Sequence, residues 1–544
     1  MPETVRESFR AFAEVIANPR VRKIQIAGAA ATLGTWAYAV ALPVFAYRAG
    51  GARAVGLLFF ARFVLAAAAA PWLGVLADRW SRRQLMLTAD AARLAIFSAM
   101  TAIAALGGPA WPVYVLAVSS TMISGSYAPA QAALMPSLVD SPEELTAANV
   151  VGNTISSVGM FAGPAVGGVL LAVSGPAAVF AVNGASFLWS LAWVVQVPRD
   201  EPPSAGGERR ALRDLSQGVK TVIHSSALRV IVGLSAAQAA VAGAFEVLVV
   251  VLALRLLHAG NAGVGWLNTA TGAGAIVGAV LVAVFAHRRR LAAGFGIGVF
   301  LWGVPIAATV LWLRLPVALL LVGLVGAGGV LVDVTGMTLI QRSADNEVLG
   351  RVFGALQSLV LTGLAVGSVA APPLVSWLGP RGAVIATGLF LPTLLALCWM
   401  PLRRIDASGR VEERPLSLLR AIPMFALLPP PTLERLAAAA TPVVVPAGRL
   451  VFDRGEHGDR FYVIDSGNAL VDAEEERELG TGGFFGEIAL LRDTPRTASV
   501  RAVDDLHLYA LERNDFLAAV TGHAPSLEAA ERVVDVRLAA GLAL

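Results

Sequence analysis

Long apolar runs fill most of the chain between Ile24 and Leu402, and short segments rich in Arg separate them. Each run holds about 20 residues, which is the length that a helix needs to cross a bilayer. The pattern therefore predicts about twelve membrane-spanning helices. They are expected to begin near Ile24, Ala54, Gln84, Trp111, Val150, Ala177, Leu228, Gly263, Leu291, Pro316, Gly354 and Gly382.

The pattern changes after Leu402. Charged residues appear, a proline-rich turn follows at Pro429 to Pro431, and short strand-like runs punctuated by glycines come next. Such a segment is typical of a soluble β domain, which we expect to start near Val411. The predicted parts are a cytoplasmic lead-in at 1–23, a six-helix bundle at 24–200, a cytoplasmic linker at 201–227, a second six-helix bundle at 228–402, and a linker with the soluble domain at 403–544.

An internal repeat relates the two predicted bundles. The segment Ala54–Trp80 aligns without gaps to Gly263–Arg289, and after a short deletion Gly175-Pro176 falls opposite Gly379-Pro380. Internal repeats of this kind are common in membrane transporters. The sequence therefore predicts two related six-helix halves.

Composition and charge support a membrane protein. The chain has 544 residues, of which 56% are hydrophobic and 15% charged, and its mean hydropathy is +0.69, far above that of soluble proteins. The net charge of +4 does not indicate a nucleic-acid partner, because the cations gather in alternate short loops. The positive-inside rule then places both termini and the soluble domain in the cytoplasm, in a multi-pass protein of the plasma (cytoplasmic) membrane. The cations in question are Arg79, Arg82, Arg83, Arg209, Arg210, Arg213, Lys220, Arg288, Arg289, Arg290, Arg403 and Arg404.

The chain offers little for catalysis. Cys398 is the only cysteine, so neither an intrachain disulfide nor a cysteine metal centre is expected. No nucleophile and base occur in a spacing that suggests an active site. We therefore expect neither an enzyme nor a bound metal or cofactor.

The segment GVLADRWSRR, between the second and third predicted spans, resembles the cytoplasmic signature of the major facilitator superfamily, G-x-x-x-D-R-x-x-R-R. The resemblance implies a twelve-span fold of two six-helix bundles. It also implies that the motif locks the bundles together through charge contacts that break during transport. Simple anchoring of cations at the cytoplasmic face is the alternative. The gating candidates are Gly74, Asp78, Arg79, Arg82 and Arg83.

The segment GMFAGPAVGG, in the fifth span, resembles the antiporter motif of exporting facilitators, G-x-x-x-G-P-x-x-G-G. The resemblance favours export over uptake, whereas close packing of small residues between helices is the structural alternative. Residues from about 20 to 400 also look like the branch of the superfamily that includes macrolide and siderophore exporters. The motif residues are Gly159, Gly163, Pro164, Gly167 and Gly168.

Five ionisable residues lie inside predicted spans, namely Arg62, Asp90, Arg93, Glu246 and Asp333. Charges in a bilayer are costly, so such residues usually face a cavity or a partner. Asp90 and Arg93 are i,i+3 neighbours that can neutralise each other, which favours a structural role. Glu246 has no cation close to it in the sequence. Glu246 and Asp333 are the leading candidates for carrying a coupling proton, and Asp90 is a third.

The segment FFGEIALLRDTPRTASV, from Phe484 to Val500, resembles the phosphate-binding cassette of cyclic-nucleotide-binding domains. The resemblance implies a β jelly roll with flanking helices. It implies that Glu487 accepts a hydrogen bond from the ribose 2′-hydroxyl and that Arg496 binds the cyclic phosphate. A domain that has lost its ligand and serves only as structure is the alternative. The cassette candidates are Phe485, Gly486, Glu487, Ile488, Ala489, Arg496, Thr497 and Ala498.

Ligand identity stays open at this point. Thr497 resembles cyclic-GMP-binding relatives, while the cassette as a whole favours cAMP slightly, so cAMP is the expected regulatory ligand and cGMP the alternative. A helix predicted from Ser526 to Leu542 is expected to cover the base.

These features together predict a secondary transporter, proton-coupled, that exports hydrophobic or amphiphilic small molecules and is regulated by cyclic nucleotide. The alternatives are a sensor or receptor that no longer transports, and a cyclic-nucleotide-gated channel. A channel is disfavoured because no carbonyl-filter motif and no arginine-rich sensor helix occur. The transported substrate, the effect of the nucleotide and the oligomeric state are not specified by the sequence.

Overall fold

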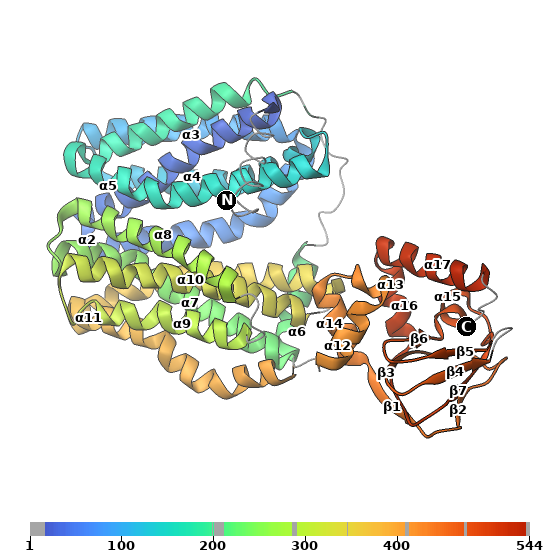
Figure 1. The fold of residues 1–544 in the computed structure, drawn as a ribbon. Helices are drawn as coiled ribbons and strands as arrows, with labels where there is room; N and C mark the ends of the chain where they lie inside the picture. The colour runs from blue at the N-terminus through green and yellow to red at the C-terminus, as the bar shows by residue number, and fades with distance from the viewer. Residues whose placement is uncertain are drawn as a thin grey trace. The chain divides into compact units, whose positions relative to one another are not determined.

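The computed structural model describes residues 17–198, 200, 211–285, 291–344, 346–408, 413–472 and 476–539. The chain divides into two compact units, Met1–Asp406 and Ala407–Leu544. The first unit is helical, and the second combines helices with two β-sheets (Figure 1).

The helical unit is built from long apolar helices. Within the described residues, eight helices are long and apolar enough to cross a membrane. The elements of this part of the chain are α2 (Pro19–Arg79), α3 (Arg82–Ala105), α4 (Ala110–Leu134), η1 (Met135–Ser137), α5 (Pro142–Val194), α6 (Ala211–His224), α7 (Ser226–Val251), η2 (Leu252–Leu256), α8 (Gly260–Phe285), α9 (Leu291–Ala308), α10 (Leu315–Ser343) and α11 (Asn346–Ser408).

Three of these helices, α2, α5 and α11, each consist of two helical arms joined at a glycine. The joints are Gly51 (φ 63°, ψ −160°), Gly175 (φ 77°, ψ −177°) and Gly379 (φ 71°, ψ 170°). A side chain strongly disfavours this backbone conformation, so glycine is needed at each joint. Gly175 and Gly379 are the residues that the internal repeat matched, and their backbone angles are nearly the same. The two halves of the unit therefore turn at equivalent places.

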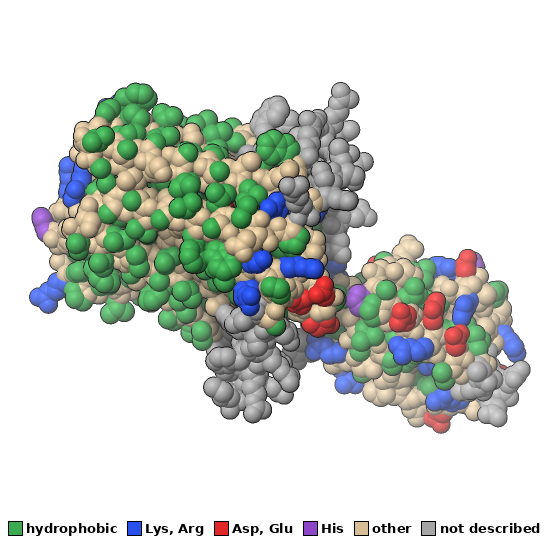
Figure 2. Space-filling model, turned by 90° about the horizontal axis from the view of Figure 1, so that it is seen from above, with side chains coloured by type: hydrophobic (Ala, Val, Ile, Leu, Met, Phe, Trp, Pro, Cys, Tyr) green, Lys and Arg blue, Asp and Glu red, His purple; other side chains and the backbone are tan. Residues whose placement is uncertain are grey.

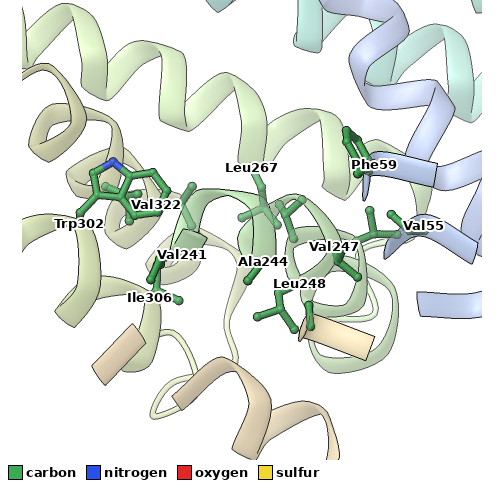
Figure 3. Packing of buried hydrophobic residues seen from close by; sticks show 14 of the residues in the cluster. Val55, Phe59, Val241, Ala244, Val247, Leu248, Leu267, Trp302, Ile306 and Val322 are labelled. Carbon is green, nitrogen blue, oxygen red and sulfur yellow. The ribbon is translucent and has the colours of Figure 1, made fainter. Parts of the chain in front are cut away.

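Apolar side chains from both halves meet in one buried cluster (Figure 3). Val55 and Phe59 of α2 belong to the same cluster as Val247 of α7 and Leu267 of α8. Large apolar side chains also remain on the outside, and hydrophobic atoms cover much of the visible face of the unit in Figure 2. So large an apolar surface suits contact with lipid.

The second unit is a sandwich of two antiparallel four-stranded sheets, with strand orders β1-β8-β3-β6 and β2-β7-β4-β5. Apolar side chains from both sheets form a buried cluster, and a second cluster lies beneath the helices. The strands are β1 (Thr441–Val445), β2 (Leu450–Phe452), β3 (Arg460–Ser466), β4 (Ala469–Asp472), β5 (Arg477–Leu479), β6 (Phe484–Phe485), β7 (Ser499–Ala502) and β8 (Leu506–Glu512). The helices are α12 (Glu413–Ala421), α13 (Pro423–Ala426), α14 (Pro430–Ala439), α15 (Glu487–Arg492), α16 (Arg513–Thr521) and α17 (Ala524–Ala539).

Candidate functional site

The predicted cassette forms a tight turn from β6 into the short helix α15. Gly486 has a φ of 94°, and a Cβ atom there would lie 2.6 Å from Nη1 of Arg496. Glycine is thus required both by the backbone conformation and by the close approach of the arginine. Ile488 and Ala489 are buried on α15. A Cβ atom on Gly458 would lie 2.7 Å from the Ala489 methyl group, so the neighbouring loop packs directly against α15.

Arg496 is buried at the centre of this turn, with 3% of its surface exposed. Its Nη1 donates to the Gly486 carbonyl (3.1 Å) and its Nη2 to the Arg460 carbonyl (2.8 Å). The guanidinium lies 4.1 Å from the centre of the Phe452 ring, and Nη2 is 3.7 Å from a carboxylate oxygen of Asp459. Burial lowers the pKa of Arg496. Arg496 is therefore a buried cation whose close hydrogen bonds go to neutral carbonyl groups, while the Asp459 carboxylate lies 3.7 Å away.

Glu487 is fully buried and pairs with the last helix of the chain. Its Oε1 accepts a hydrogen bond of 2.6 Å from Nη1 of Arg537 in α17. Arg537 also donates to the Phe484 carbonyl (3.2 Å) and lies over the Phe484 ring at 4.3 Å. Burial raises the pKa of the Glu487 carboxyl, and the charge of Arg537 opposes that rise. A helix was expected from Ser526 to Leu542, where α17 lies at Ala524–Ala539, but Arg537 was not among the predicted site residues.

Three polar atoms of the cassette are buried without a hydrogen-bond partner among the described residues. They are Oε2 of Glu487, Nε of Arg496 and Oγ1 of Thr497. Each such atom costs about 1–3 kcal/mol when left unsatisfied. The remaining predicted residues support the site, since Phe485 stacks on the Tyr462 ring (5.3 Å) and the Ala498 side chain is fully buried. An acceptor and two donors are thus poised for a ligand with hydroxyl and anionic groups.

Of the predicted gating motif, the side chains of Gly74, Asp78 and Arg79 lie outside the described residues. Arg82 and Arg83 begin α3, and their backbone N–H groups donate to the two carboxylate oxygens of Asp200 (2.6 and 3.1 Å). Nη2 of Arg83 donates to the Val195 carbonyl (2.6 Å). A carboxylate at a helix N-terminus is favourable. Asp200 ties the chain after α5 to this motif, and nothing in the motif itself points to it.

The small residues of α5 pack against the first arm of α2. A Cβ atom on Gly159 would lie 2.5 Å from Cγ2 of Thr32, and one on Gly163 would lie 2.3 Å from Cβ of Trp36. Gly167 makes a similar approach to the α2 backbone. This stripe lets the two helices come together more closely than side chains would allow.

Gly168 lies beyond this stripe and meets the other half of the unit. A Cβ atom there would lie 2.9 Å from Cα of Gly265 in α8, and one on Gly265 would lie 2.7 Å from the Pro164 carbonyl oxygen. A Cβ atom on Gly272 would likewise lie 2.7 Å from the Met160 carbonyl oxygen. The antiporter-like motif therefore packs on one side within its own bundle and on the other against the second bundle.

Arg62 supplies the charge that Glu246 lacks in the sequence. Its Nε donates to Oγ1 of Thr121 (2.8 Å), and its guanidinium lies 5.2 Å from the Phe59 ring and 6.0 Å from the Tyr38 ring. Arg62 and Glu246 interact electrostatically. Arg62 lies on α2 and Glu246 on α7, so the two charges belong to different halves of the unit.

Asp90 lies in a different polar cluster. It is fully buried, and its Oδ2 accepts a hydrogen bond from Oγ of Ser190 (2.7 Å), which in turn contacts the Tyr127 hydroxyl (3.2 Å). The Arg93 guanidinium lies 5.2 Å from the Tyr127 ring. This network favours the structural role for Asp90.

Asp333 is exposed on α10. Within the described residues, no group of His, Cys, Asp or Glu could hold a metal ion.

The folds of the two units define a multi-pass helical membrane protein with a β-sandwich ligand domain. A family model described as a transmembrane secretion effector matches residues 11–419, well over half of the chain. A second model, described as a cyclic nucleotide-binding domain, matches residues 442–523. The chain therefore belongs to the transmembrane secretion effector family of major facilitator transporters, and it carries a cyclic nucleotide-binding domain in its C-terminal part.

Two curated relatives are each similar to about a quarter of this chain. The cAMP-dependent protein kinase regulatory subunit of Emericella nidulans is 34% identical over 143 residues, which are 25% of this chain and 35% of the relative. A cyclic nucleotide-gated potassium channel of Mesorhizobium japonicum is 34% identical over 142 residues, again 25% of this chain and 38% of the relative. The chain thus spans little more than a third of the length of these curated relatives.

Among solved structures, the chain is similar to the regulatory domain of Toxoplasma gondii PKA with cAMP. The identity is 29%, with 22% of this chain and 46% of that chain covered and a TM-score of 0.20. It is also similar to the Thermus thermophilus catabolite activator protein. There the identity is 30%, with 21% and 58% of the two chains covered and a TM-score of 0.20.

Proposed function

We propose that this protein is a secondary exporter of hydrophobic or amphiphilic small molecules whose transport cycle responds to cAMP bound by the C-terminal domain. Membership of the secretion effector family supports transport. The direction and the substrate class rest on the antiporter-like motif and on the resemblance to macrolide and siderophore exporters. The boundaries proposed for its parts are 1–23, 24–200, 201–227, 228–402 and 403–544.

The observation that carries ligand binding is the set of unpartnered buried atoms on Glu487, Arg496 and Thr497. A cyclic nucleotide has the groups to satisfy them. Its ribose 2′-hydroxyl can donate to the free Oε2 of Glu487, and its phosphate can accept from Arg496 and Thr497. The likeness of this region to cAMP-dependent kinase regulatory subunits supports cAMP over cGMP.

The first experiment is a calorimetric titration of cAMP and cGMP into the full-length protein in detergent. Arg496→Ala should weaken cAMP binding by about tenfold to a hundredfold or more, because a charge-assisted bond contributes about 1.5–3 kcal/mol. The matched control is Arg492→Ala, since Arg492 ends α15 four residues before Arg496 but pairs with Asp535 at the surface. Wild-type protein that is folded but binds neither nucleotide would contradict the proposal.

We also propose twelve spans with both termini in the cytoplasm. The count follows if each arm of α2, α5 and α11 crosses the membrane once and α3 and α7 to α10 cross once each. It also requires a crossing by α4, which is not one of the eight helices that are apolar enough by hydropathy. In a Cys398→Ser background, a cysteine at Gly108 should react with an impermeant reagent from outside the cell, and one at Gln196 should not. The opposite labelling pattern would overturn this topology.

Proton coupling is proposed to run through Glu246, with Asp333 as the second candidate. Glu246 is half-buried and faces a cation from the other half of the unit. Loss of a proton from Glu246 would strengthen its attraction to Arg62, and uptake of a proton would weaken it. A contact between the halves that responds to protonation is what a proton-driven rocking cycle requires.

Two other functions remain distinguishable from this one. A sensor that no longer transports should bind cAMP but move no substrate. Asp78→Ala should then leave its cAMP binding unchanged. A cyclic-nucleotide-gated channel should carry ionic current in planar bilayers when cAMP is added. The similarity to a gated potassium channel covers 25% of this chain.

A further inference from the structure

A groove of about 710 Å³ lies between the second arm of α2 and helix α4. This volume is within the range of small-molecule sites. The groove takes no part in the contacts of Arg62, Glu246 or the α5 glycines described above. Most of the residues that line it are apolar, including Leu57, Leu58, Ala61, Leu65, Val115 and Met122.

The charged side chain of the groove and its phenol lie at one end, whereas Ser119 lines the groove further along α4 and donates its hydroxyl to the Val115 carbonyl (3.0 Å). Arg53 is the one charged residue among the described residues that line it, and it follows the α2 joint at Gly51 by two positions. Tyr114 also lines the groove, four residues after α4 begins at Ala110. Both helices thus start at this end, where a span meets the lipid headgroups. Arginine and tyrosine are typical of that depth.

The length of the groove matches one leaflet of a bilayer. Arg53 and Leu65 are twelve residues apart on one helical arm, which is about 18 Å at 1.5 Å per residue. Half of a hydrocarbon core of about 30 Å is roughly 15 Å. The groove therefore runs from the headgroup region to about the bilayer centre, and its rims are open, since Leu57 and Val115 are 50% and 55% exposed.

We propose that this groove binds a membrane phospholipid with an anionic headgroup. The phosphate pairs with Arg53, and one acyl chain lies along the apolar wall as far as Leu65. A membrane helix from a partner protein fits less well, because such a helix crosses both leaflets and is about 10–12 Å wide. The inference does not depend on the substrate or on the nucleotide response.

The test is native mass spectrometry of the full-length protein, titrated in detergent with phosphatidylglycerol or phosphatidylcholine. Wild-type protein should retain phosphatidylglycerol at a markedly lower lipid concentration than it needs to retain phosphatidylcholine. Arg53→Gln should remove that preference, with a loss of about tenfold in apparent affinity for the anionic lipid. Ala61→Trp should fill the groove and weaken the binding of both lipids. Arg314→Gln is the matched control, because Arg314 is an exposed loop arginine that does not line the groove.

Several outcomes would overturn the proposal. Equal retention of the two lipids by wild-type protein would show that the charge of Arg53 does not select an anionic headgroup. Unchanged binding in both Arg53→Gln and Ala61→Trp would place any retained lipid elsewhere on the apolar surface. Displacement of the lipid by a transported substrate, lost in Ala61→Trp, would make the groove a substrate site. All four proteins should show the same melting temperature before they are compared.

Discussion

At the scale of single residues, the nucleotide domain pairs a buried carboxylate with a partly buried arginine from a different part of the chain. Glu487 lies in the cassette, and Arg537 lies 50 residues later on α17. Burial alone would favour the protonated form of the acid, and Arg537 counteracts that effect. Because Arg537 occupies Oε1 and leaves Oε2 free, it can keep Glu487 charged while a ribose hydroxyl binds. We therefore propose that Arg537 acts on the ligand through Glu487, as a positioning residue.

Arg537→Gln should make cAMP binding depend on pH. Without the arginine the pKa of Glu487 rises further, so protonation competes with the ribose bond as the pH falls. Affinity should drop by about tenfold for each unit by which that pKa exceeds the pH, and it should recover at alkaline pH. Calorimetry at pH 6 and pH 8 checks this, with Arg532→Gln as a control on the exposed face of α17. A variant as insensitive to pH as the wild type would show that Arg537 does not set the charge of Glu487.

In the membrane part, Glu246→Gln should reduce transport driven by a pH gradient in energised vesicles, and Asp333→Asn should have the smaller effect. Glu246 alone faces a cation from the other half of the unit, whereas Asp333 is exposed on α10. Arg62→Gln should shift the pH optimum of transport, because the charge that favours ionised Glu246 is lost. If Glu246→Gln and Asp333→Asn both keep full gradient-driven transport, the coupling assignment is wrong.

The sequence predicted these residues to different degrees. The cassette residues are consecutive or nearly so, so a local pattern was enough to find Glu487 and Arg496. Arg537 lies in a helix without a motif, and Asp200 lies in a polar segment with several other charges. Arg62 was recognised as a costly charge in a span, but its interaction with Glu246 depends on how two distant helices pack. Contacts of that kind cannot be read from spacing along the chain.

At the scale of elements, some helix starts were predicted closely, whereas α5 and α11 each begin eight residues before the starts expected at Val150 and Gly354. The starts expected at Leu291 and Pro316 fall within one residue of the starts of α9 and α10. Apolar runs bounded by polar residues or proline fix such positions. At Gly379 the backbone leaves the helical conformation (φ 71°, ψ 170°), so α11 consists of two helical arms that meet at this residue without an intervening loop.

Gly379→Ala tests the joint in α11. Because a side chain disfavours this backbone conformation, the substitution should destabilise the helical unit by about 1–3 kcal/mol. The matched control is Gly354→Ala in the same helix, where a Cβ atom would meet nothing within 4 Å. That change should be neutral or slightly stabilising. Thermal unfolding followed by tryptophan fluorescence compares the two, and equal melting temperatures would show that the joint tolerates a side chain.

At the scale of the whole molecule, a transporter and a nucleotide domain on one chain suggest that ligand binding biases the transport cycle. Such a bias requires cAMP to bind one state of the transporter more tightly than the other. A coupling of about 1–3 kcal/mol would change the population of that state by roughly 5- to 150-fold. By the same linkage, a transported substrate should change the affinity for cAMP.

The last prediction follows from that reciprocity. In proteoliposomes with the C-terminal domain outside, cAMP should change the initial rate of substrate transport by wild-type protein and leave the rate of Arg496→Ala unchanged. A truncated chain ending at Asp406 separates loss of regulation from loss of the transporter, because it retains the helical unit and lacks the ligand domain. If cAMP binds with Arg496-dependent affinity and the transport rate stays the same, there is no coupling free energy between nucleotide binding and transport. Binding would then stand as a property of the C-terminal domain alone.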